Sequence, residues 1–599
     1  MKLHADTSDF RLTEGDTSSI ALKTDNVNAT VKLDERIGEF TSNGDNTKVE
    51  FPVNQYICFM DRFKWFMDQG DLELESDAKT ASVNEDLQLT GTNFVSTRPE
   101  QDSLSFMAPK ARYDLKKHLI TANDVPYIQV ADALIVPDSN RVRIRRNAEM
   151  DPISNAVITA NSVTRYHRIY NANVNIRKKR EYTAYGDYDY VDETEKAFKI
   201  HFTDIRPDTS YQTRAKGRIS EDEKFQLSPA FDYFGDVALA AAEKDLTFTG
   251  STRILHDCPG IARNWMRFSG PIDPKEVFIP VGDSLRDDTG LDIGAGVYLT
   301  TDDPFHPYPT FLSRVTSKGD RTIISAKGLL HYDKTKKSYL IGSKDKIRQP
   351  DLPGDLVSLN TVNCDLSANG HISTGTELGQ VKAEPFGTLD LVEGDSARAA
   401  AHVSLYLDFF FDDNALEKMT DAIMAYPEQK AVIVPSTPYE RSMREVLGKE
   451  KSDKLISELS IKGEIKRLPD ELVRSIVLAD VKFRWNSDDG SWQSQGPIGV
   501  ATILKRPVFR TIKGKIEFQR KRSGDAMTVL LMLDDQTWWF FSYTRGQMLT
   551  YSSDAAFNTR ISELKEDKMK VEGKKDAPDY YFMLTGKRKV DDFRDRFGL

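Results

Sequence analysis

Cysteine is scarce in this sequence. Cys58, Cys258 and Cys364 are the three cysteines among 599 residues, and no two of them have Cys-x-x-Cys spacing. An odd number of widely separated cysteines supports neither a disulfide framework nor a zinc site. We therefore expect all three to be small, buried, apolar side chains.

Long apolar runs are also lacking. No stretch of about 18 apolar residues occurs, so we predict no membrane-spanning helix. The first ten residues lack the apolar core of a signal peptide and alternate like a strand. Two interpretations follow, a cytoplasmic protein or a fragment of a longer exported one. The abrupt start within a strand pattern favours the second, in the periplasm or at the cell surface.

The chain has no excess of positive charge. Asp and Glu number 92 against 82 Lys and Arg, a formal net charge of -10, so a duplex-binding surface and a nucleic-acid partner are not expected. With 31 Phe and 22 Tyr the chain is too aromatic for disorder. Its length predicts about four domains.

Catalytic signatures are missing as well. The sequence contains no GxSxG, P-loop or GxGxxG motif in a suitable context, and its nine histidines form no HxH or HExxH pair. We therefore expect no cofactor and no enzymatic activity. The best candidate for a metal or acid/base site is Asp302, Asp303 and His306 in a proline-rich loop, with further ligands from elsewhere. A plain surface loop is the competing interpretation.

Three other polar groups have weaker functional interpretations. His256 stands near Cys258, a possible base beside a possible nucleophile, although adjacent strand residues point to opposite faces. Residues 185–193 alternate Asp with Tyr, which could bind calcium or a sugar, but a solvated strand end is favoured. Basic clusters at 141–146, 177–180 and 513–522 are typical of the solvent-exposed, or wet, faces of strands. Contact of these clusters with anionic glycolipid or phosphate is the alternative interpretation.

Alternation with a period of two dominates residues 1 to about 410. It predicts antiparallel strands separated by turns, and the absence of a βαβ pattern disfavours a parallel sheet. The clearest strands are at 142–144, 156–160, 172–176, 198–202 and 246–249. An aromatic cluster at 54–68 predicts either a strand pair or a helical plug that caps the β array.

A change of character near residue 412 predicts a separate α+β domain. Asp412 has the position of a helix N-cap. Residues Trp538–Phe541, as a strand, would place aromatic side chains on both of its faces, and one of these faces needs to be covered by a helix or by a partner protein. A helix of the same domain is favoured. We predict helices at 415–424, 439–447, 452–459 and 470–478, strands at 431–435, 481–485, 498–504, 515–520, 527–533, 537–543 and 547–551, and a loosely packed short helix at 591–599.

A short pattern recurs in the first part of the chain. It consists of a small or apolar residue, then Tyr-Asp or Cys-Asp, polar residues, an apolar pair and a small residue, at 111–122, 330–342 and 362–375, with a weaker copy at 231–234. Recurrent patterns of this kind are typical of stacked units. The pattern resembles the OstA-type repeats of periplasmic lipopolysaccharide-transport proteins. That resemblance implies an open β-jellyroll whose interior carries acyl chains.

Together these features predict a mainly β protein, an elongated stacked β-repeat body of the jellyroll or solenoid type with a C-terminal α+β domain. The predicted segments are 1–90 with the aromatic cap, 91–230 and 231–410 as repeat regions, and 411–599. We expect a non-enzymatic envelope scaffold or glycolipid-shielding protein that contacts envelope proteins and glycolipid, with Ile120, Ile158 and Ile341 facing the repeat interior. A carbohydrate-active hydrolase and a secreted surface adhesin remain alternatives.

Overall fold

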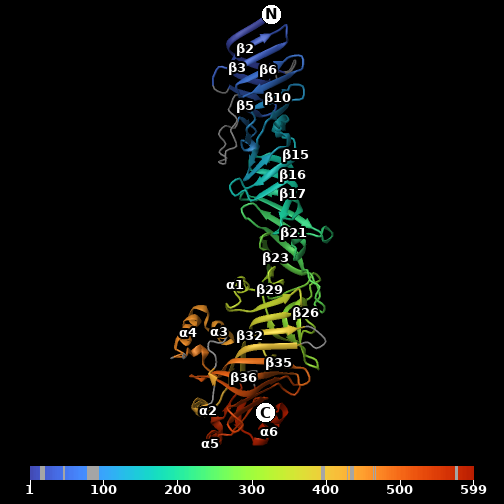
Figure 1. Ribbon diagram of the computed structural model, residues 1–599. Coiled ribbons are helices and arrows are strands. Elements are labelled where there is room, and N and C mark those ends of the chain that lie inside the picture. Colours follow the sequence, from blue (N-terminus) through green and yellow to red (C-terminus); the bar gives the residue numbers. More distant parts are fainter. Residues whose placement is uncertain are drawn as a thin grey trace. The chain divides into compact units, whose positions relative to one another are not determined.

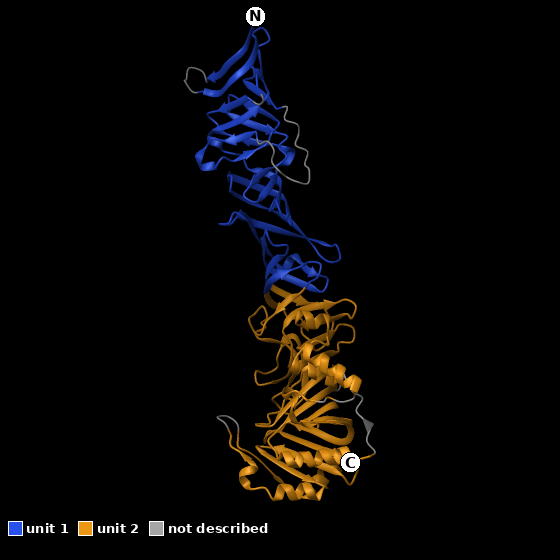
Figure 2. Ribbon diagram, turned by 90° about the vertical axis from the view of Figure 1, so that its left-hand side faces the viewer, with its two compact units in different colours: residues 1–250, 269–277 blue, residues 251–268, 278–599 orange. Residues whose placement is uncertain are grey.

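The computed structural model divides the chain into two compact units, coloured separately in Figure 2. Unit 1 comprises residues 1–250 and 269–277, and unit 2 comprises residues 251–268 and 278–599. The structure describes residues 1–13, 20–44, 47–76, 93–392, 398–427, 430–431, 437–462, 465, 467–573 and 578–599. The described part of each unit is mainly antiparallel β-sheet, as the alternation predicts.

A 12-stranded sheet holds the first part of the chain (Figure 1). Its strands run in the order β14-β11-β10-β7-β6-β3-β2-β4-β5-β8-β9, and β1 pairs with β2. Their bounds are β1 Lys2–Thr13, β2 Ile20–Lys32, β3 Ile37–Ser42, β4 Thr47–Phe51, β5 Tyr56–Met60, β6 Arg62–Phe66, β7 Asp71–Glu75, β8 Phe94–Ser96, β9 Ser105–Phe106, β10 Lys110–Asp114, β11 Leu119–Asn123 and β14 Val142–Ile144. The aromatic cluster therefore forms strands, β5 and β6, which pair with other strands and not with each other.

An 11-stranded sheet follows, in the order β12-β13-β15-β16-β17-β18-β19-β21-β22-β23, with β20 paired to β21. Its strands are β12 Ile128–Val130, β13 Ala133–Val136, β15 Ile153–Ala160, β16 His167–Lys178, β17 Glu181–Val191, β18 Ala197–Pro207, β19 Thr213–Ile219, β20 Gln226–Ser228, β21 Phe231–Ala240, β22 Leu246–Ile254 and β23 Met266–Ile272. All five strands predicted between 142 and 249 are confirmed, and in the predicted segments buried residues mostly alternate with partly or fully exposed ones.

Unit 2 contains a 16-stranded sheet that continues through residue 410, where β33 pairs with β35. Its strands are β24 Ile279–Val281, β28 Gly328–Asp333, β29 Ser338–Gly342, β30 Leu356–Asn360, β31 Leu366–His371, β32 Lys382–Val392, β33 Arg398–Asp408, β34 Lys430–Ala431, β35 Arg474–Asn486, β36 Ser491–Leu504, β37 Arg506–Gln519, β38 Ala526–Met532, β39 Trp538–Thr544, β40 Gln547–Ser552, β41 Lys570–Val571 and β42 Tyr580–Leu584. A three-stranded sheet comprises β25 Ile293–Leu299, β26 Pro307–Arg314 and β27 Arg321–Ser325.

Six α-helices belong to the described part of unit 2. They are α1 Lys344–Arg348, α2 Asp413–Ala425, α3 Thr437–Leu447, α4 Lys449–Lys462, α5 Ala555–Ser562 and α6 Lys587–Phe597. Asp412 caps α2 as predicted, because its Oδ1 accepts a hydrogen bond of 2.8 Å from the Ala415 N–H. Helices α3 and α4 pack on the sheet through a core that includes Tyr439, Met443 and Leu459 (Figure 1). None of the described helices has the length and apolar character needed to cross a membrane.

The aromatic strand β39 is covered by helices on both faces, as favoured from the sequence. Trp538 and Phe540 pack with Val590 and Phe593 of α6, which buries this part of the C-terminal tail. On the other face, the ring of Phe541 lies 6.4 Å from that of Phe557 in α5. The C-terminal helix is confirmed, but the expectation of loose packing is wrong, since Val590 is fully buried.

One predicted helix is wrong. Residues 470–478 form a short 3-10 turn at Asp470–Leu472 and then enter β35. Pairing of Leu478 with Leu405 on β33 buries this apolar run, and that tertiary pairing overrides the local helix signal after Pro469. The predicted strand at 431–435 is described only at Lys430–Ala431, and the remainder lies outside the described residues.

The recurrent Tyr-Asp pattern corresponds to a hairpin with a four-residue loop. Asp114 and Asp333 each end a strand, and each accepts a hydrogen bond of 3.0 Å from the N–H three residues later. The fourth loop residue has a positive φ, 47° at His118 and 50° at Lys337, which turns the chain into the next strand. Such a loop also precedes Leu366, where Asn360 caps the turn and Cys364 has φ 61°.

The third copy is therefore offset, because Asn360 and not Asp365 has the capping role. The weak copy at 231–234 lies inside strand β21 and makes no turn. What recurs is a type of hairpin loop, which explains the sequence pattern through local backbone chemistry.

Candidate functional site

A hollow lined by basic side chains lies on the exposed face of unit 1. Its volume is about 800 Å³, and it is formed by the ends of the β16–β17 hairpin and the β18–β19 hairpin. Six cations face three carboxylates in its lining. The cations are Arg177, Lys178, Arg180, Arg206, Arg214 and Lys216, and the carboxylates are Glu181, Asp204 and Asp208. We call this set the basic hollow.

The alternation of β19 creates one wall of the basic hollow. Its buried residues are Thr213, Ala215, Gly217 and Ile219, and its exposed residues are Arg214, Lys216 and Arg218. Successive side chains of a strand point to opposite faces, so the three cations line one surface. Lys216 also lines an adjoining hollow together with Arg218, which extends the basic surface along β19.

Two arginines of the hollow directly face each other across neighbouring strands. Arg206 of β18 pairs in register with Arg214 of β19. Like charges at such opposed positions repel and destabilise a sheet. Each is partly neutralised by a carboxylate, at 3.3 Å between Arg206 and Asp204 and at 2.9 Å between Arg214 and Asp208.

Two carboxylates of the hollow, Glu181 and Asp208, have pKa values below their usual range. A hydrogen bond from Lys178 lowers the pKa of Glu181, and a hydrogen bond from Arg214 lowers the pKa of Asp208. The charges of these four groups therefore cancel in pairs. Among the residues that the structure describes, no carboxylate lies at ion-pair distance from Lys216, so its charge is available to an anion.

An aromatic ring borders the basic hollow. The guanidinium of Arg180 lies 5.0 Å from the ring centre of Tyr211, whose side chain is 48% exposed. A cation held against a ring keeps its charge at a fixed place. The rim of the hollow thus combines a positioned charge with an exposed aromatic surface.

The sequence pattern identified one part of the basic hollow and missed another. The cluster 177–180 was identified as a wet strand face, and three of its side chains line the hollow. The wall formed by Arg214 and Lys216, which Arg218 extends into the adjoining hollow, was missed, although the strict alternation of exposed cations with buried residues along β19 was a usable signal. The register that joins the two hairpins is a tertiary property that the sequence pattern does not display.

The three predicted interior positions are completely covered. Ile120, Ile158 and Ile341 each have 0% exposure, and their neighbours are side chains of the chain itself. Ile120 pairs with Tyr113 across β10 and β11, and Ile341 pairs with Leu330 across β28 and β29. These positions belong to the packed core of their sheets.

Asp302, Asp303 and His306 lie in the loop that precedes β26. The Nδ1 atom of His306 lies 2.9 Å from the Pro304 carbonyl oxygen, and Asp303 forms a long ion pair of 3.8 Å with Arg522. The described residues contain no group of three His, Cys, Asp or Glu side chains that could hold a metal ion.

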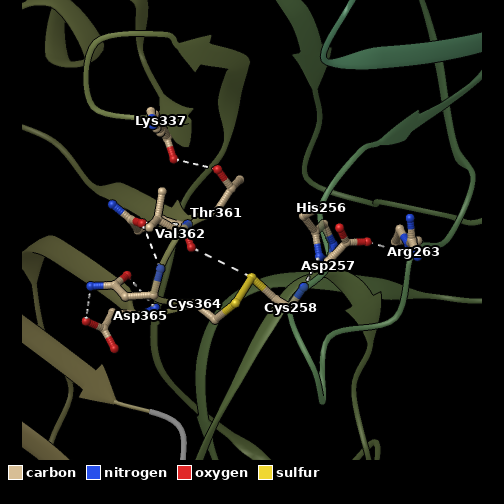
Figure 3. Close-up of a disulfide and its surroundings, with 11 residues drawn as sticks. His256, Asp257, Cys258, Arg263, Lys337, Thr361, Val362, Cys364 and Asp365 are labelled. Atoms are coloured by element: carbon tan, nitrogen blue, oxygen red, sulfur yellow. Dashed lines mark hydrogen bonds and ion pairs between the residues drawn. A yellow bond between two sulfur atoms is a disulfide. The ribbon is translucent and has the colours of Figure 1, made fainter.

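Cys258 and Cys364 form a disulfide across 106 residues of unit 2 (Figure 3). The expectation that all cysteines are unpaired is wrong, because folding brings the loop after β22 against the hairpin loop that precedes β31. Cys58 alone fits the prediction, since it is buried and free. The disulfide also removes the thiol that the His256 and Cys258 hypothesis required.

His256 is nevertheless held beside the disulfide. Its Nδ1 accepts a hydrogen bond of 3.1 Å from the Cys258 N–H (Figure 3). Burial lowers the pKa of this imidazole. Asp257 lies on the outer side of the loop, 3.5 Å from Arg263. Both interactions fix the backbone of the disulfide loop.

The Asp-Tyr alternation at 185–193 lies mostly on β17. Asp187 and Asp189 are on its outer face, where they contact His201 at 2.8 Å and Tyr170 at 2.6 Å. Tyr190 lies on the buried face, and its hydroxyl donates to the Leu227 carbonyl. Asp187 and Asp189 are thus engaged by cross-strand partners, as expected of a solvated strand, whereas Asp192 is buried and accepts hydrogen bonds from Thr194 and the Lys196 N–H in the loop after β17.

The prediction of a wet face for cluster 513–522 is wrong for two of its cations. The side chain of Arg520 is only 10% exposed and lies near Asp525, at 3.6 Å. Lys515 donates to the Ser494 carbonyl at 2.7 Å and lies 4.6 Å from the ring of Phe597. Lys515 thus connects β36 with helix α6, whereas Arg520 lies between Asp525 and the ring of Phe305, 5.0 Å from its centre.

No protein-family model matches this sequence, and no curated protein is similar enough to it to indicate a relationship.

Proposed function

We propose that this protein is a non-enzymatic scaffold of the cell envelope whose basic hollow holds the anionic head group of a glycolipid. The observation that carries this proposal is the surplus of cations in the hollow: six cations line it with three carboxylates, and a fourth carboxylate, Asp102, lies 3.7 Å from Arg180. Phosphate and carboxylate groups are recognised by clustered Arg and Lys in this way. The opposed pair of Arg206 and Arg214 supports it, because an anion between the hairpins relieves their repulsion.

The disulfide supports a place in the periplasm or at the cell surface. Disulfides form and persist in oxidising compartments and are rare in the cytosol. The Cys258–Cys364 bond joins distant parts of unit 2, so it is a structural crosslink of the fold. The resemblance of the Tyr-Asp hairpins to the OstA-type repeats favours the same compartment, and a stacked jellyroll remains part of this proposal.

The proposed contact is with the head group and not with acyl chains in the β interior. Ile120, Ile158 and Ile341 have no exposed surface that a chain could reach. The hollow, in contrast, is open and bordered by charged side chains, which suits a hydrated, charged group. Envelope proteins are further proposed partners through the extensive exposed sheet faces.

The proposal is tested by binding of the purified protein to vesicles. Phosphatidylcholine vesicles with and without lipid A, the phosphorylated glycolipid, are compared by co-sedimentation at low and high salt. We expect binding to the lipid A vesicles only, and a decrease with salt because exposed charges are screened. Equal binding to both vesicles, or none to either, would contradict the proposal.

A further inference from the structure

A second polar hollow lies in unit 2, beside the loop that the disulfide holds. Its volume is about 570 Å³. Its wall includes Arg263, Asn264, Trp265, Asp287, Asp288, Tyr308 and Arg314. It combines two aromatic rings with several hydrogen-bonding groups, a composition typical of small-ligand sites. We call it the tryptophan hollow.

Arg314 is oriented in this hollow by a buried carboxylate. Its Nε and Nη2 donate to Asp287 Oδ2 at 3.2 and 2.9 Å, and the side chain of Asp287 is 2% exposed. Burial raises the pKa of Asp287, but hydrogen bonds from Thr289, Arg314 and the Leu291 N–H outweigh it and hold that pKa at about 2. The carboxylate therefore stays charged and fixes the guanidinium.

The other side of the guanidinium remains available. More than half of the Arg314 side chain is exposed, and no described acceptor lies at hydrogen-bond distance from its Nη1. An arginine held in this manner presents a rigid donor to a planar anion such as a carboxylate. Little conformational entropy is lost when that anion binds, because the side chain is already ordered.

The aromatic residues of the hollow are fixed as well. The guanidinium of Arg253 lies 4.3 Å from the ring centre of Trp265, and the indole is partly exposed. The Tyr308 hydroxyl donates to Asp320 at 2.6 Å and accepts from the Thr316 N–H at 3.0 Å. The segment that carries Trp265 follows Cys258, so the disulfide limits its movement.

We propose that the tryptophan hollow binds an acidic saccharide. The apolar face of the sugar ring lies against the indole of Trp265, and its carboxylate accepts hydrogen bonds from Arg314. Asn264, Ser313 and Thr316 supply polar groups for ring hydroxyls. Rigid aromatic surface beside oriented polar groups suits a ligand that has one apolar face and a hydroxyl-rich edge. The saccharide site lies in unit 2, and its binding does not require the basic hollow of unit 1.

The test is calorimetric titration of the full chain with oligogalacturonates and with their methyl esters, which have the same ring but no charge. We expect the acid to bind and the ester to bind at least about tenfold more weakly, the effect of one charge-assisted hydrogen bond. Equal affinity for both would overturn the acidic-saccharide assignment, as would absence of binding by the acid.

Two variants separate the roles of the residues. Arg314→Lys keeps the positive charge but loses the planar guanidinium group with its several N–H donors. Trp265→Phe reduces the aromatic surface on which the sugar ring stacks. Each should weaken binding of the acid about tenfold, while Arg484→Lys, an exposed arginine of β35, serves as the matched control and leaves binding unchanged. Loss with Arg314→Lys but full binding by Trp265→Phe would indicate a simple anion site and would overturn the saccharide assignment.

The methyl ester comparison uses the unmodified protein, so it holds even if a variant folds poorly. The same titration with Arg214→Gln and Lys216→Gln should give wild-type saccharide affinity. Failure of the tryptophan hollow is thereby distinguished from failure of the basic hollow.

Discussion

Arg206 and Arg214 occupy directly opposed positions on the neighbouring antiparallel strands β18 and β19. Two guanidinium groups so placed repel each other. The repulsion is offset only by the ion pairs with Asp204 and Asp208, which are partly exposed and therefore weak. An arrangement that costs stability in the free protein is typical of a binding surface, where the ligand supplies the missing charge.

The first prediction concerns this pair. Replacing Arg206→Thr removes the repulsion and introduces a good strand former, so the free energy of unfolding should be unchanged or rise by up to about 1 kcal/mol. Urea unfolding followed by circular dichroism measures it. A loss of more than about 1 kcal/mol would show that the pair stabilises the sheet.

The second prediction concerns the disulfide. Joining residues 106 apart restricts the unfolded chain, so replacing both Cys258 and Cys364 by Ser should destabilise unit 2 by about 4 kcal/mol. Five of the six tryptophans lie in unit 2, at 265, 485, 492, 538 and 539, so tryptophan emission during urea unfolding reports mainly on it. Dithiothreitol should lower the wild-type midpoint and leave the double variant unaffected. A midpoint insensitive to the reductant in both would mean that the crosslink is absent or contributes nothing.

The third prediction concerns the start of α2. Asp412 caps this helix and accepts hydrogen bonds of 3.0 and 2.8 Å from Arg560 of α5, so Asp412→Ala should cost about 1–3 kcal/mol. Asp412→Asn keeps the Oδ1 acceptor of the cap but loses the charge and the Oδ2 acceptor of Arg560, so its cost should be smaller than that of the alanine variant. Equal stability of the alanine variant and the wild type in urea unfolding would refute this role.

The same carboxylate predicts a pH dependence. Burial raises the pKa of Asp412, but the hydrogen bonds from Arg560 and the Ala415 N–H outweigh it, so the folded pKa lies below the unfolded value of about 3.9. The stabilisation is complete above that unfolded pKa and is lost as the pH falls through the folded pKa. The difference in stability between wild type and Asp412→Asn should therefore shrink with acid below about pH 4. A constant difference down to the acid transition would contradict this linkage.

The fourth prediction concerns the cover of β39. Phe593 of α6 is 9% exposed and its ring lies 5.8 Å from that of Phe540, so Phe593→Ala should cost about 3 kcal/mol. Arg588→Ala on the exposed side of the same helix is the control, with an expected change below about 0.5 kcal/mol. Similar effects of the two substitutions on the thermal midpoint would show that α6 does not seal the aromatic face.

Local patterns in the sequence predicted local structure well. The alternation at 156–160 and 172–176 and the N-cap at Asp412 depend on neighbouring residues alone, and the structure confirms them. The helix expected at 470–478 failed because burial against β33 decides its conformation. The recurrent Tyr-Asp pattern was real, but its physical basis is a capped hairpin loop.

The candidate sites depend on contacts between distant residues. Cys258 and Cys364 are 106 positions apart, and no spacing rule connects an isolated pair. Likewise, Arg214 becomes part of a basic site only when β19 pairs with β18 and brings it beside Arg206. Such registers arise from the folding of the whole sheet, so composition and short motifs do not display them.

The central claim is that the basic hollow binds the head group of an anionic glycolipid, and the affinity of two charge-matched double variants for lipid A vesicles tests it most directly. Arg214→Gln with Lys216→Gln removes two cations from the hollow, and Arg143→Gln with Arg168→Gln removes two exposed cations elsewhere on unit 1. At about 1 kcal/mol for each cation near an anionic surface, the account predicts an affinity about 30-fold lower for the first variant and near wild type for the second. Equal weakening of the two variants would contradict it, because net charge alone would then explain the binding.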